Sequence, residues 1–160
     1  MNPDGMRFCG MCGRSLETAT SGRERRRVSV VFIDLASFSD LTREQDPEQV
    51  RDLADDVLTA VAAVVEEYDG HVDAFRGDGL VALFGAPHSH PDDAERSVRA
   101  ASAALAAIER IGAARGIALR GRAGVNTGVV IAGSIGSGRV REYTVMGSAV
   151  NLAARLEAAA

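Results

Sequence analysis

The chain has 160 residues, of which 46% are hydrophobic and 25% charged, a composition that fits one globular domain with a core and argues against disorder. Its formal net charge of −4 and isoelectric point of about 5.4 disfavour a broad nucleic-acid-binding face. No apolar run approaches the roughly 18 residues of a membrane-spanning helix, and the N-terminus lacks the apolar core of a signal peptide, so we expect a cytoplasmic protein without a membrane span.

A CxxC pair near the N-terminus, Cys9 and Cys12 in RFCGMCGRSL, has the spacing of a zinc knuckle. Structural zinc takes four ligands, and the three histidines of the chain lie far along the sequence, so residues 1–16 offer half a zinc site. The missing ligands would come from residues before Met1 or from a partner chain. A redox pair or inert thiols are the alternatives, although no adjacent βαβ pattern supports a thioredoxin-like motif.

The polar segment 17–27 is typical of a linker and ends in a basic cluster, which we interpret as a solvated charge run in preference to a contact with lipid or nucleic acid. The folded domain then begins at Val28, where the apolar run VSVVFI predicts a strand that ends in Asp34. The remaining predicted elements are, in chain order, a helix from Asp46 to Gly70, a hairpin at Val72–Phe84, a helix from Pro91, two short strands around Asn126–Gly128 and a helix from about Ser148. This order predicts an α+β fold, a ferredoxin-like βαββαβ sandwich whose mainly antiparallel sheet has helices packed on one face.

The hairpin places Asp78 in a Gly-flanked turn. Aspartate is common in turns for structural reasons, so this residue alone indicates no function. In a ferredoxin-like arrangement, however, the hairpin lies beside the first strand, and Asp78 and Asp34 converge. A divalent cation such as Mg²⁺ is the natural partner of two such carboxylates.

In the last predicted helix, Asn151 and Arg155 are four residues apart and share a face. Spacing alone also fits two solvated surface residues. Arginine is, however, the usual side chain that stabilises a phosphoryl transition state.

Four segments, in order and spacing, resemble the catalytic domain of class III adenylate and guanylate cyclases: FIDLASFSDL, FRGDGLVALFG, AGVNTGVVIAGSIG and YTVMGSAVNLAARLE. The resemblance covers Val28 to the C-terminus. RFCGMCGRSL resembles the second half of a zinc ribbon that precedes this domain in large bacterial cyclases, and would hold Zn²⁺. The family domain continues through further strands, so we expect the chain to be incomplete at its C-terminus.

The resemblance implies a lyase that converts a nucleoside triphosphate to a 3′,5′-cyclic nucleotide at the interface of a homodimer. Asp34 and Asp78 would bind two Mg²⁺ or Mn²⁺ ions, and the Leu35 carbonyl would add a ligand. Asn151 would orient the ribose, and Arg155 would stabilise charge at the α-phosphate. The backbone would cradle the β and γ phosphates at Leu35, Ala36, Ser37, Phe38 and Ser39.

Recognition of the base departs from the family pattern. Ala74 stands where adenylate cyclases carry a lysine, and the whole chain contains no lysine. Thr144 occupies the partner position, as in a bacterial subgroup of the family. The resemblance favours ATP over GTP, whereas these two residues predict weak selectivity. The alternative function is a non-catalytic module that binds nucleotide or dimerises.

Overall fold

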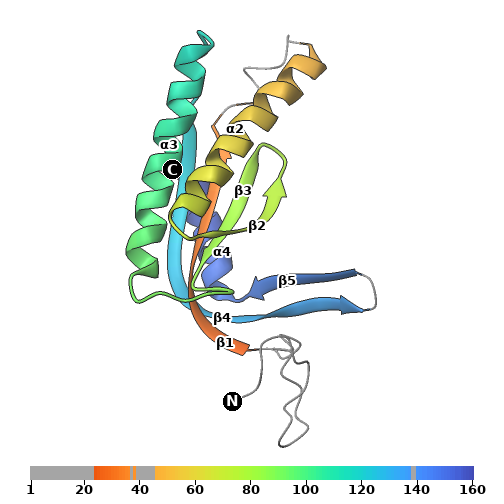
Figure 1. Ribbon diagram of the computed structural model, residues 1–160, viewed down its shortest axis with the longest axis vertical. Coiled ribbons are helices and arrows are strands. Elements are labelled where there is room, and N and C mark those ends of the chain that lie inside the picture. Colours follow the sequence, from red (N-terminus) through yellow and green to blue (C-terminus); the bar gives the residue numbers. More distant parts are fainter. Residues whose placement is uncertain (1–23, 37, 39–45, 138–139) are drawn as a thin grey trace, which may run out of the picture.

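The computed structural model describes residues 24–36, 38, 46–137 and 140–160 (Figure 1). Its elements, in chain order, are β1 (Glu24–Leu35), α2 (Pro47–Glu67), β2 (His71–Arg76), β3 (Gly79–Phe84), α3 (Asp93–Ala114), β4 (Gly121–Ser137), β5 (Val140–Met146) and α4 (Ser148–Ala158). No helix of the described ranges combines the length and apolarity needed to cross a membrane.

The five strands form one sheet in the order β2-β3-β1-β4-β5, with antiparallel neighbours throughout. The first four strands have the predicted ferredoxin-like order, so the α+β class and the antiparallel sheet are confirmed. Helices α2 and α3 cover one face, as expected for the βαββαβ core (Figure 1). Helix α4, which follows that core, packs on the opposite face against β4 and β1.

Strand β1 supplies both faces of the sheet because successive side chains alternate. Val31 and Ile33 point into the cluster beneath α2 and α3, where they meet the α2 side chains Val57 and Val61. Val30 points the other way, into the cluster that α4 covers. Because β1 is buried on both faces, its sequence is a continuous apolar run and does not alternate between apolar and polar residues.

Two boundaries differ from the sequence-based predictions. Strand β1 begins at Glu24, so the last residues of the predicted linker belong to the sheet. Strand β4 is one continuous strand, whereas the glycines around residues 126–128 predicted two short ones. Gly124 and Gly128 lie directly under α4, and their lack of a side chain allows the helix to approach the strand. These glycines mark a packing contact. In the sequence, they look the same as the glycines of a turn.

The predicted start of the helix at Asp46 is confirmed. The Asp46 side chain accepts a hydrogen bond from the Glu48 amide at 2.8 Å, and Pro47 occupies the first turn of α2. This N-cap satisfies an amide that has no partner within the helix.

Candidate active site

Asp34 and Asp78 meet where β1 and the β2–β3 hairpin end. Asp34 is paired with Gly79 across the β1–β3 ladder, and the Leu35 amide donates to the Asp78 carbonyl at 3.3 Å. Gly77 has a φ of 61°, a left-handed conformation that glycine adopts without strain and that closes the turn before Asp78. A side chain at Gly79 would lie 2.5 Å from the backbone carbonyl oxygen of Ile33 and 2.9 Å from a carboxylate oxygen of Asp34, so glycine is required for this close approach.

The negative charges of this pair oppose one another. Partial burial raises the pKa of Asp78 above its ordinary value, and the charge of Asp34 raises it further. Arg122 acts in the opposite direction on the same group. The net effect raises the pKa, so ionisation of Asp78 is less favourable at this site than in water even with Arg122 nearby.

Arg122, which sequence reasoning missed, is the cation that the fold brings to Asp34. The two residues are paired across the β1–β4 ladder, and Arg122 donates to Asp34 Oδ2 from Nη2 at 2.8 Å and from Nε at 3.3 Å. This hydrogen bond, followed by the charge of Glu157, raises the pKa of Arg122 above its ordinary value. Glu157 is on α4, and its Oε1 lies 2.7 Å from Arg122 Nε. Only the register between distant strands reveals this cluster.

Asn151 and Arg155 form a second, separate group. Both are exposed on α4 and line a cavity of about 490 Å³ between that helix and β4. Neither Asp34 nor Asp78 lines this cavity. The helix is anchored beside it by Asn126, whose Nδ2 donates to the Ala149 carbonyl at 3.0 Å. One chain thus presents the predicted cation ligands and the predicted transition-state residues in two different places.

The predicted base-recognition residues lie on different strands. Ala74 of β2 is paired with Val81, a member of the cluster beneath α4. Because directly paired residues share a face of a sheet, Ala74 faces the side of the sheet that carries Asp34 and α4. Thr144 of β5 is paired with Gly133 of β4.

The predicted phosphate cradle is described only in part. The amides of Leu35 and Ala36 already donate to the carbonyls of Asp78 and Arg120, the second at 2.8 Å, and the Phe38 side chain is buried in the core. Any cradle must therefore use other amides of the segment. The remaining predicted residues, Ser37, Ser39, Cys9 and Cys12, lie outside the described residues, and the zinc half-site stays a prediction.

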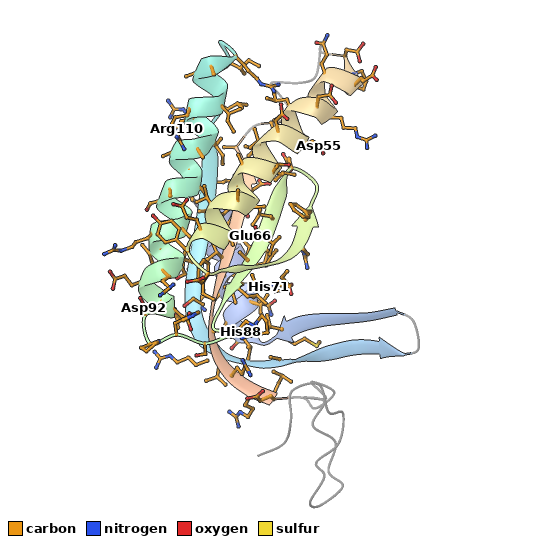
Figure 2. The ribbon with its side chains drawn as sticks, viewed as in Figure 1. Asp55, Glu66, His71, His88, Asp92 and Arg110 are labelled. Carbon is orange, nitrogen blue, oxygen red and sulfur yellow. The ribbon has the colours of Figure 1, made fainter. Side chains whose placement is uncertain are left out.

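The three histidines gather elsewhere. His71, His88 and His90 line a cavity of about 420 Å³ together with Glu66, and Figure 2 labels Glu66, His71 and His88 at and below the lower end of α2. Within the described ranges, no three His, Cys, Asp or Glu side chains are grouped so that they could hold a metal ion. The histidines are therefore not assigned to a metal site.

The family model for the Adenylate and Guanylate cyclase catalytic domain matches residues 21–160. The chain belongs to this family. Adenylate cyclase 1 of Rhizobium meliloti (strain 1021) is 31% identical over 137 residues, which cover 83% of this chain and 21% of that protein. The structure of the guanylyl cyclase Cya2 matches with a TM-score of 0.81 and 34% identity, covering 86% of this chain and 72% of that one. The adenylyl cyclase CyaB from P. aeruginosa gives a TM-score of 0.81, 32% identity, and coverage of 86% and 74%.

The cyclase domain spans 21% to 25% of the length of the curated relatives it matches. The relatives named above include both an adenylyl and a guanylyl cyclase. Membership of the family therefore establishes a cyclase catalytic domain. It does not determine whether the substrate is ATP or GTP.

The donor set of the cyclase domain fits a hard divalent cation. Asp34 and Asp78 supply carboxylate oxygens, the ligands that Mg²⁺ prefers. Burial raises the pKa of Asp78, and the charge of Asp34 raises it further; a bound cation would offset the second of these effects. Mg²⁺ commonly takes one or two carboxylates and completes its shell with water and substrate phosphates. Two carboxylates are therefore sufficient.

Proposed function

We propose that the cyclase domain converts a nucleoside triphosphate to a 3′,5′-cyclic nucleotide and pyrophosphate, at sites formed between two copies of the domain. ATP is the expected substrate, with GTP accepted. The observation that supports this most directly is the convergence of Asp34 and Asp78 on one point, with Asn151 and Arg155 presented separately on α4. A nucleotide substrate also favours a cytoplasmic location.

In the reaction, the ribose 3′-hydroxyl loses its proton to water, its oxygen forms a bond to the α-phosphorus, and the bond from that phosphorus to the bridging oxygen of pyrophosphate breaks. Two Mg²⁺ or Mn²⁺ ions held by Asp34 and Asp78 would lower the pKa of the 3′-hydroxyl and neutralise the triphosphate. Asn151 would hold the ribose by hydrogen bonds, and Arg155 would stabilise the charge that develops on the α-phosphate oxygens. These two side chains are exposed, so a second copy can reach them.

Pairing of two copies is favoured by an apolar face of the β4–β5 ribbon. Ile131 and Met146 are paired across this ribbon, and Val129 lies two residues along the same strand face. All three are exposed, with Met146 at 59%. The ribbon extends beyond α2 and α3 (Figure 1), so neither helix covers this face. Exposed apolar patches of this kind mark interaction surfaces, and a second copy would bury this one.

Product formation tests the proposal. The protein is incubated with ATP or GTP, each with Mg²⁺ or Mn²⁺, and cyclic nucleotide is quantified for wild type, Asp34→Ala and Asp78→Ala. Both variants should lose turnover while their thermal unfolding stays cooperative. Asp55→Ala is the matched control, because Asp55 is an exposed carboxylate on α2 whose 3.9 Å contact with Arg51 contributes little stability.

Normal product formation by Asp78→Ala would contradict the cation assignment. Nucleotide binding by the wild type without any product, under all four conditions, would instead indicate the non-catalytic module.

A further inference from the structure

Arg122 lies between two acids from different elements. Both of its hydrogen bonds go to Asp34 of β1, from Nη2 and from Nε. Glu157 of α4 is as close, with Oε1 at 2.7 Å from Nε, yet this contact lacks the alignment of a hydrogen bond. The guanidinium is therefore oriented toward Asp34, and the carboxylate of Glu157 lies close enough to accept a hydrogen bond after a small rotation.

The carboxylate of Glu157 lacks a well-aligned hydrogen-bond donor among the described residues. Its side chain is 14% exposed, and among the described residues no donor makes a hydrogen bond to the buried Oε1. Burial raises the pKa of this carboxyl, against the attraction of Arg122. The ion pair with Arg122 offsets only part of the desolvation cost, because a poorly aligned contact is weaker than a charge-assisted hydrogen bond. Any event that frees the guanidinium therefore favours its rotation toward Glu157.

The last turn of α4 packs tightly against the backbone of β4. A side chain at Gly124 would overlap the backbone carbonyl of Ala153 and the backbone amide of Glu157. The same helix carries Asn151 and Arg155 on its exposed face. A change in how Glu157 is held is therefore transmitted to the helix that presents those two side chains.

We propose that Glu157 is a positioning residue and the second acceptor of Arg122: loss of the Asp34 charge turns the guanidinium to Glu157 and fastens the last turn of α4 to β4. The role in catalysis rests on the proposed function, in which a cation at Asp34 neutralises that charge. Cation binding at one site then steadies the α4 residues that serve the other site of a dimer.

Amide hydrogen exchange tests the switch without any cation. Asp34→Asn keeps the shape of the side chain and removes its charge, so exchange of the amides of residues 155–158 should slow about two- to fivefold, the lower end of the range of coupling between contacting groups. In Glu157→Gln the same change at Asp34 should have a smaller effect, because an uncharged amide oxygen is a weaker acceptor for a guanidinium than a carboxylate. The control Glu109→Gln, an exposed glutamate on α3, should leave the response as in wild type. An unchanged rate in Asp34→Asn, or equal slowing with Glu157→Gln, would overturn the switch.

Mn²⁺ affinity, measured by electron paramagnetic resonance titration, tests the link to the cation. In Glu157→Gln the guanidinium stays on Asp34 and competes with Mn²⁺, so the dissociation constant should rise about two- to fivefold. In an Arg122→Gln background the proposed effect of Glu157→Gln on Mn²⁺ affinity should disappear, whereas a general effect of the Glu157 charge would persist. Persistence of the effect in that background, or an unchanged dissociation constant in Glu157→Gln alone, counts against the proposal. If the wild type binds no Mn²⁺, the proposed function fails, and the exchange result alone decides the switch.

Discussion

Gly124→Ala should separate α4 from the sheet. The added Cβ would overlap two backbone atoms of α4 and lie 2.8 Å from Glu157 Cα, whereas ordinary contacts begin at 3.4 Å. The third contact alone requires a shift of 0.6 Å, since 3.4 minus 2.8 is 0.6, and the backbone overlaps require more. Because no rotamer change can relieve a clash between backbone atoms and a Cβ, we expect about 3 kcal/mol of destabilisation, the upper end for overpacking.

The free energy of unfolding is measured by urea denaturation, and the midpoint of thermal unfolding should fall by about 6–12 °C. A shift of roughly 1 Å in α4 also misplaces Asn151 and Arg155, so cyclic-nucleotide formation at saturating substrate should fall on the order of 100-fold. A loss of stability below about 0.5 kcal/mol, the size of an ordinary surface change, would refute the close approach of α4 and β4.

Gly128→Ala is the matched comparison on the same strand. Its Cβ would lie 2.7 Å from the Ala149 side chain and 3.8 Å from the nearest backbone atom, so the clash is with one removable methyl group. Ala149→Gly should therefore relieve it, and the double variant should be more stable than the sum of the single effects by about 1 kcal/mol. No single substitution can rescue Gly124→Ala in this way. Equal behaviour of the two glycines would show that the clash at Gly124 involves no backbone.

Three further predictions concern the site. Asp34→Ala and Arg155→Ala should each be inactive alone, and each heterodimer formed on mixing should have about half of the activity of a wild-type dimer, because one of its two interface sites is complete; heterodimers without activity would contradict a shared site. Ala74 offers no hydrogen bond to a base, so kcat/KM for ATP and GTP should agree within about a factor of 10, and Ala74→Lys should shift preference toward ATP; a wild type that favours ATP about a thousandfold would show that other groups read the base. Burial and the Asp34 charge raise the pKa of Asp78 in the fold, so its stabilising contribution is present at low pH and is lost as pH rises through the raised pKa. Asp78→Asn should therefore increase the free energy of unfolding of the cation-free protein near pH 7 and not near pH 3, as measured by urea denaturation at both values.

Much of the local structure follows from the sequence, because its causes are local. The Asp46 cap acts on an amide two residues away, and the left-handed turn at Gly77 depends on that glycine alone. The apolar run VSVVFI predicts a strand, and the structure shows β1 there. The order of the elements then predicts that β1 and the hairpin are neighbours, which brings Asp34 beside Asp78.

The remaining features depend on contacts between residues far apart in the chain. Arg122 is 88 residues from Asp34, and only the β1–β4 register makes them neighbours. Glu157 joins them because α4 crosses to the face opposite α2 and α3, which the amphipathic pattern of a helix does not specify. The glycines of β4 have the same sequence signal as a turn, and the helix packed against them decides that the strand continues. Sequence spacing determines which side chains share an element, whereas strand register and helix packing determine which charges meet.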